Sequence, residues 1–116
     1  MAEPVIVWNT RDPLGGRSQA EFEAEARRLL QDRVIAAYFF GSFGTEAFGR
    51  DSDVDMIIVA ETDKSFVERA LDFPELLDLV PDMDLLVYTP REFESLTTEP
   101  SAGFWTSVVA SLRRFV

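Results

Sequence analysis

The sequence predicts a small α+β (α/β) domain in which a mixed sheet of about three to five strands is flanked by helices. Three short apolar runs of strand-like composition alternate with capped, amphipathic segments, and the connections between them are short. The chain has 116 residues, of which 47% are hydrophobic and 28% charged, as is typical of one globular domain. We therefore expect residues 1–116 to form a single domain.

The N-terminal part predicts one amphipathic helix. Residues 4–8 are apolar and fit either an edge strand or an arm, and residues 9–17 have the glycine and proline content of a loop. Ser18 and Glu21 form a capping-box pattern, which begins a helix lasting to about Asp32. The expected core stripe of this helix consists of Phe22, Ala26, Leu29 and Leu30.

Three apolar runs are the predicted strands: Val34–Phe40, Val54–Ala60 and Met83–Thr89. They are too short and too rich in branched and aromatic residues to be independent helices. The connection between the first two, Gly41–Ser52, is punctuated by glycines and is compatible with one helical turn.

The remaining segments predict further helices. Ser65-Phe66-Val67-Glu68 repeats the capping-box pattern, and the helix that follows is interrupted near Pro74 and ends at about Val80. Thr89-Pro90-Arg91-Glu92 combines a cap with a proline at the first helical position, so a short helix follows the third strand. Gly103–Val116 is expected to be one C-terminal helix, apolar over much of its circumference.

The absence of two residue types narrows the chemistry. The chain contains no cysteine and no histidine, which excludes disulfides, thiolate zinc sites, thiol nucleophiles and imidazole bases. Lys64 is the only lysine and no glycine-rich loop leads into it, so a P-loop is excluded as well. Catalysis in this chain would depend on carboxylates, hydroxyls, arginines and a hard metal ion.

Net charge and hydropathy indicate the environment. The net charge of −10 argues against binding to a long nucleic acid and suits Mg²⁺, which prefers oxygen ligands. The longest apolar run, Val34–Phe40, is too short to cross a membrane, which takes about 20 residues. Glu3 and Pro4 stand where a signal peptide would carry positive charge. We expect a soluble, cytoplasmic protein.

Aspartates at the starts of two predicted strands form the candidate site. Asp53 and Asp55 head the second strand and project from the same face, about 7 Å apart. Asp84 stands near the start of the third strand, and if the two strands are neighbours, about 4.8 Å apart, it completes a triad. Three such carboxylates can hold two cations about 3.5–4 Å apart, the geometry of two-metal phosphoryl or nucleotidyl transfer. Asp82 lies on the same face and competes with Asp84, but it follows Pro81 and is expected in the turn.

Gly41 and Ser42, at the end of the first strand, form a candidate phosphate-binding turn. Glycine lets a phosphate approach the backbone, and a serine hydroxyl can donate to a phosphate oxygen. The same serine also suits a cap for a following turn.

Together these residues resemble the signature of the DNA-polymerase-β-like nucleotidyltransferase superfamily, and most of all its smallest members, the minimal nucleotidyltransferase (MNT) domains. The resemblance covers about residues 34–96 and comprises Gly41-Ser42, ten intervening residues, Asp53-Val54-Asp55 with its apolar strand, and Asp84 in a later strand. It implies a polymerase-β-like palm and the transfer of a nucleoside monophosphate, with ATP as the expected donor.

The resemblance also implies roles for single residues. Gly41 and Ser42 would contact the triphosphate, and Asp53 and Asp55 would ligate two Mg²⁺ ions. Asp84 would ligate the catalytic metal and help to deprotonate the acceptor hydroxyl. Many members of the superfamily carry a basic residue shortly after Gly-Ser, whereas Phe43-Gly44-Thr45-Glu46 has none. Arg50, at the far end of the loop, is the candidate to replace it.

Proteins of this class often work beside a small helical partner of the HEPN type, and some act as antitoxins by nucleotidylating that partner. The broad apolar face of Gly103–Val116 fits an interface with such a partner, and the chain is also compatible with a homodimer. A second hypothesis is a non-catalytic binding module, an antitoxin that neutralises its partner by occlusion alone.

Overall fold

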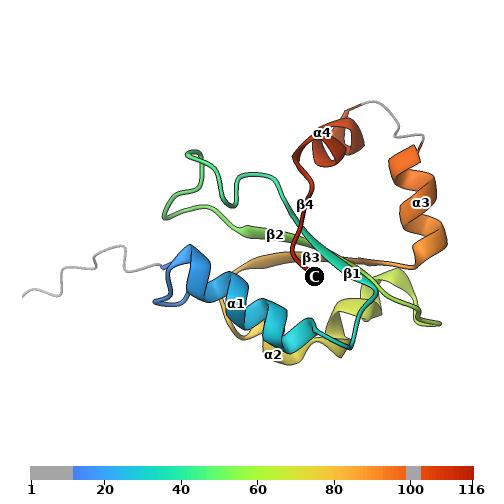
Figure 1. Cartoon of the computed structure of the whole chain (residues 1–116), viewed down its shortest axis with the longest axis horizontal. Coiled ribbons are helices and arrows are strands. Elements are labelled where there is room, and N and C mark those ends of the chain that lie inside the picture. Colours follow the sequence, from blue (N-terminus) through green and yellow to red (C-terminus); the bar gives the residue numbers. More distant parts are fainter. Residues whose placement is uncertain (1–11, 99–102) are drawn as a thin grey trace, which may run out of the picture.

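A mixed four-stranded sheet organises the computed structural model, which describes residues 12–98 and 103–116 (Figure 1). The strands are β1 (Ala36–Phe40), β2 (Val54–Val59), β3 (Met83–Tyr88) and β4 (Arg113–Arg114), in the order β3-β2-β1-β4. β1 is antiparallel to β2 and β4, whereas β2 and β3 are parallel. The predicted α+β class with a mixed sheet is confirmed.

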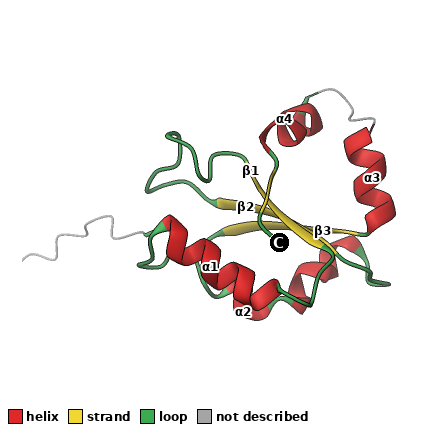
Figure 2. Cartoon of the chain, in the orientation of Figure 1, coloured by secondary structure: helices red, strands yellow, loops and turns green. Residues whose placement is uncertain are grey.

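Helices cover both faces of the sheet (Figure 2). α1 (Gln19–Leu30) lies on one face with the crossover between β2 and β3, which contains the 3-10 helix η1 (Phe66–Asp72) and the single turn α2 (Pro74–Leu77). α3 (Pro90–Thr98) and α4 (Phe104–Ser111) lie on the other face. Because both faces are covered, β2 is buried at five of its six positions, which explains its continuous apolar run.

The predicted cap of α1 forms as expected. The backbone N–H of Glu21 donates to Oγ of Ser18 at 3.0 Å, and Oε1 of Glu21 accepts from the backbone N–H of Ser18 at 2.9 Å. Phe22, Ala26 and Leu30 are buried beneath the sheet, while Leu29 is half-buried. The helix is thus fixed at its start by its cap and along its length by its apolar stripe.

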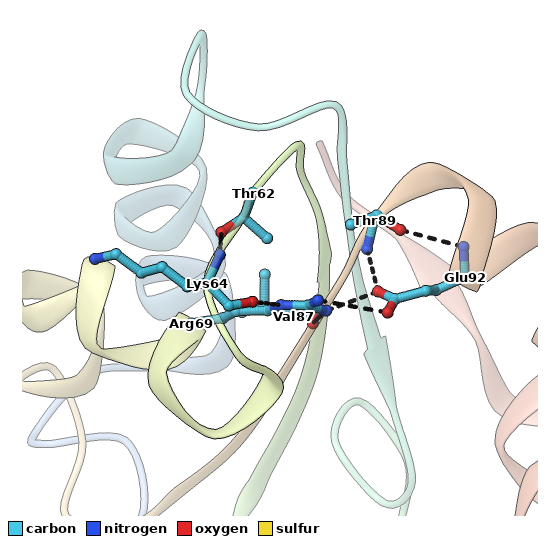
Figure 3. A network of polar contacts seen from close by, with 6 residues as sticks. All are labelled: Thr62, Lys64, Arg69, Val87, Thr89 and Glu92. Atoms are coloured by element: carbon cyan, nitrogen blue, oxygen red, sulfur yellow. Dashed lines mark hydrogen bonds and ion pairs between the residues drawn. The ribbon is translucent and has the colours of Figure 1, made fainter.

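A buried arginine ties the crossover to the next helix (Figure 3). Arg69 in η1 donates through Nη1 to the carbonyl of Val87 in β3, at 3.0 Å, and to Oε1 of Glu92 in α3, at 2.6 Å. Its Nε donates to the carbonyl of Lys64 at 3.0 Å. Glu92 also accepts from the backbone N–H of Thr89, at 2.9 Å, so it caps α3 as well. This network joins η1 to β3 and to the start of α3.

The C-terminal segment corrects the prediction of one helix over Gly103–Val116. α4 ends at Ser111, Leu112 is extended, and Arg113–Arg114 pair with β1 as the fourth strand. Phe115 is buried, with its ring centroid 4.1 Å from that of Phe39. Pairing with the open edge of β1 and burial of Phe115 outweigh continuation of the helix. The apolar face expected to meet a partner is therefore partly used within the chain, through Val108 and Phe115.

Three smaller expectations also differ from the structure. The side chain of Ser65 does not cap the next helix; its hydroxyl donates to Glu68 instead, and the segment is a 3-10 helix. Within Gly41–Ser52 the structure has turns and no helical turn. The fourth strand comes from the C-terminal segment, and residues 4–8, interpreted as an edge strand or arm, lie outside the described residues.

Three apolar side chains of η1, Phe66, Val67 and Leu71, are exposed to solvent, the last two most of all. Val67 is 82% exposed and Leu71, four residues later, is 70% exposed. None of the helices in the described part of the chain is long and apolar enough to span a membrane.

Candidate active site

The start of β2 meets the start of β3, and this brings the predicted aspartates together. The parallel register places Asp55 directly opposite Asp84, and their carboxyl groups share a hydrogen bond. Asp53 comes just before β2 and is close enough for its charge to act on Asp55. By strand alternation Asp55 and Asp84 share the face of Ile57 and Leu86, on the side of α3 and α4.

The environment raises the pKa of Asp55 to about 6. Burial is the main cause, followed by the hydrogen bond to Asp84 and the negative charges of Asp84 and Asp53. Near neutral pH this carboxyl therefore holds its proton far more readily than an ordinary aspartate. A cation placed among the three groups would remove the repulsion that causes part of this shift.

The Gly41 position is shaped by contact with Asp55. Gly41 has a φ of +70°, and a Cβ at this position would collide with Oδ2 of Asp55 and lie 3.4 Å from its Cγ. Only glycine is free of both the backbone strain and the collision. The turn after β1 thus lies against the carboxylate of Asp55. The carbonyl of Ser42 accepts from the backbone N–H and the hydroxyl of Thr45, at 2.9 and 2.6 Å, which closes the turn.

Two cavities flank Asp55. The larger, about 480 Å³, is lined by Phe40, Asp55, Met83, Asp84, Leu85 and Leu86. The smaller, about 180 Å³, is lined by Phe40, Gly41, Asp55, Ser107, Val108 and Ser111. The larger is within the size range of small-molecule sites. Asp55 therefore stands between two cavities, one bordered by the other carboxylate and one by the turn.

The donor chemistry of the aspartates fits a hard divalent cation. They offer only carboxylate oxygens, the ligands that Mg²⁺ prefers. Across residues 12–98 and 103–116, however, no group of three or more acidic side chains is gathered closely enough to hold a metal ion as it stands. The assignment of Asp53, Asp55 and Asp84 as metal ligands stays a prediction.

The other predicted residues lie at the edge of the site. Asp82 is exposed in the turn before β3, and its carbonyl accepts from the backbone N–H of Val54 at 3.4 Å. Arg50 is exposed in the loop between β1 and β2, nine residues beyond Gly41. The register thus sets Asp84, rather than Asp82, opposite Asp55.

Sequence reasoning missed the contribution of α4. Ser107 and Ser111 line the smaller cavity, and Ser111 reaches the turn itself, accepting from the backbone N–H of Gly41 at 3.0 Å. Two serines spaced one helical turn apart in a mostly apolar helix are the signal that could have indicated this.

Comparison with protein families matches residues 25–96 to the model described as polymerase beta, nucleotidyltransferase. The matched region contains Gly41, Ser42 and all three aspartates of the candidate site. Comparison with curated proteins and with solved structures finds no match.

Proposed function

This chain belongs to the polymerase beta nucleotidyltransferase family, and we propose that it is a Mg²⁺-dependent enzyme that transfers AMP from ATP to a hydroxyl group. The observation that carries the proposal is the pairing of Asp55 with Asp84 directly beside the Gly41 turn. Two carboxylates brought together next to a glycine turn suit a site for cations and phosphates together.

In the proposed reaction the acceptor oxygen attacks the α-phosphorus of ATP. A new oxygen–phosphorus bond forms, the bond from the α-phosphorus to the bridging oxygen breaks, and pyrophosphate leaves. Asp84 accepts the proton of the attacking hydroxyl, and Gly41 and Ser42 hold the triphosphate in line. Asp53, Asp55 and Asp84 would hold Mg²⁺, which when bound stabilises the charge on the phosphate oxygens.

We place the acceptor hydroxyl on a small helical partner of the HEPN type, for which this chain would act as antitoxin. The resemblance to minimal nucleotidyltransferase domains supports this assignment. The larger cavity, about 480 Å³, is within the size range of small-molecule sites and leaves room for the nucleotide.

The test is transfer of label from α-labelled ATP to the partner protein in the presence of Mg²⁺. Asp53→Ala/Asp55→Ala should abolish labelling. Asp63→Ala is the matched control, because Asp63 is exposed and follows the far end of β2. Equal labelling by wild-type protein and the double variant would overturn the proposal.

One observation favours a second candidate, a binding module that acts by occlusion. Residues 41–49 contain no lysine or arginine that would attract a triphosphate. A double-alanine variant that still neutralises its partner in cells, without transferring label, would identify this function. A variant that binds the partner but fails to neutralise it would identify the enzyme.

A further inference from the structure

The last residue of α4 and the segment that follows it touch the turn of the candidate site, and Ser111 does so from one side. Ser111 Oγ accepts from the backbone N–H of Gly41 at 3.0 Å and donates to the carbonyl of Val108 at 3.1 Å. The hydroxyl is therefore oriented by its own helix and holds an amide 70 residues away. This amide belongs to the glycine that lies against the carboxylate of Asp55.

Two residues later, the same segment reaches the other end of the turn. The guanidinium of Arg113 lies over the rings of Phe39 and Phe43, at 5.1 and 5.9 Å from their centroids. Its Nη2 and Nε lie 3.3 and 3.6 Å from the position that a Cβ of Gly44 would occupy. Its Nη1 donates to Oε1 of Glu23 in α1 at 2.6 Å, which fixes the guanidinium in place.

The position of Arg113 matters because of charge. The net charge is −10, and residues 41–49 contain one acidic residue and no basic residue. A triphosphate would meet repulsion at this turn unless a cationic group stood beside it. The fold brings the basic side chain of Arg113 against the turn, from a strand more than 60 residues away in the sequence.

We propose that Ser111 and Arg113 are positioning residues that hold the Gly41–Gly44 turn between them in the form that binds the triphosphate. Ser111 fixes the amide of Gly41, and Arg113 supplies positive charge at Gly44. This inference rests on the proposed function. It makes the C-terminal segment, which lies outside the family match, part of the nucleotide site.

The experiment compares two pairs of variants with two controls. Ser111→Ala removes the acceptor and Ser111→Thr retains it; Arg113→Gln removes the charge and Arg113→Lys retains it. Ser95→Ala, on the exposed part of α3, and Arg114→Gln, on the neighbouring position of β4, are the controls. Circular dichroism and thermal melting show whether each variant is folded.

The main measurement is calorimetric titration with Mg²⁺ and an ATP analogue that resists cleavage between the α- and β-phosphorus. Loss of one hydrogen bond or one charge contact should raise Kd about tenfold, corresponding to about 1.4 kcal/mol. Ser111→Thr and Arg113→Lys should restore most of the affinity. Since AMP lacks the triphosphate, its Kd should change much less than that of the ATP analogue in Arg113→Gln.

Amide hydrogen exchange gives a second, ligand-free readout. Ser111→Ala should speed exchange at Gly41 while leaving α1 unchanged, because only the turn loses its acceptor. If Ser111→Ala and Arg113→Gln bind the ATP analogue as tightly as wild-type protein, the positioning role is wrong. The proposed function is not affected by that outcome. Wild-type protein that binds no Mg²⁺–nucleotide would overturn the proposed function and this inference together.

Discussion

At the scale of single residues, Asp55 makes stability depend on pH. Its pKa is about 6 in the folded protein against an ordinary value of 3.8, so the folded chain holds a proton that the unfolded chain has released. The free energy of unfolding therefore falls as pH rises from about 4 to about 6. Asp55→Asn, neutral at every pH, should raise Tm by several degrees at pH 7.5 without metal, and the gain should shrink below pH 5.

Thermal melts in EDTA at pH 5 and pH 7.5 check this expectation. Asp63→Asn serves as the control, because it removes one exposed carboxylate far from the site. A gain for Asp55→Asn that is equal at the two pH values would show that repulsion at the site is not its cause.

Gly41 gives a second prediction at the residue scale. Gly41→Ala should lower the free energy of unfolding by about 1–2 kcal/mol because its backbone is left-handed. The collision with Asp55 should lower it further. Gly16→Ala, with a φ of +85° and open space around it, should show the backbone cost alone. Gly49→Ala, also in open space, should be nearly neutral. Urea denaturation measures the stability of all three variants. Equal losses of stability for Gly41→Ala and Gly16→Ala would show that the collision with Asp55 does not contribute.

At the scale of elements, the contact of Arg69 with Glu92 joins η1 to α3. The hydrogen bond and charge of Arg69, aided by the backbone N–H of Thr89, lower the pKa of Glu92 to about 2. The stabilisation is therefore complete above about pH 4.5 and is lost as pH falls toward 2. Glu92→Gln should lower Tm at pH 7, and its difference from wild-type protein should disappear near pH 2.

Arg69→Met tests the same network from its buried side. The substitution leaves the carbonyls of Lys64 and Val87 without this donor. We therefore expect the free energy of unfolding, measured by urea denaturation, to fall by about 2 kcal/mol or more. Arg28→Met is the control, since Arg28 is exposed and pairs only locally with Glu25. A loss no larger than that of the control would contradict the role assigned to Arg69.

At the scale of the whole molecule, nucleotide binding should stabilise the fold. A ligand at 100 times its Kd adds about 2.7 kcal/mol to the free energy of unfolding, or about 10 °C in Tm for a chain of this size. We expect this shift with ATP and Mg²⁺ together, and a much smaller one with ATP in EDTA. Asp53→Ala/Asp55→Ala should show no shift, and an undiminished shift in that variant would place the nucleotide elsewhere.

The parts of the fold that depend on interactions between residues close in the sequence could be predicted from the sequence. The capping box at Ser18 and the apolar run of β2 depend on neighbours in the sequence, and both are present as predicted. The end of α4 was predicted wrongly, since an apolar segment gives no sign of whether it continues as a helix or pairs with a distant strand. Here the open edge of β1 decides, and it is remote in sequence.

The candidate site shows the same division. Strand alternation alone places Asp53 and Asp55 on one face of the sheet. It does not choose between Asp82 and Asp84, because these two residues also share a face. Only the register of β3 against β2 sets Asp84 opposite Asp55. Ser111 and Arg113 were not found because their contact with the turn exists only once β4 has paired with β1.

The solvent-facing pair Val67 and Leu71 has a practical consequence for handling the protein. In dilute buffer the net charge of −10 keeps copies apart, with a screening length of about 10 Å at 0.1 M salt. At 1 M salt that length falls to about 3 Å. Charge repulsion between copies then no longer opposes contact between these exposed apolar side chains. Purification and crystallisation at high salt concentration should therefore promote aggregation, and low-salt preparations should stay monodisperse.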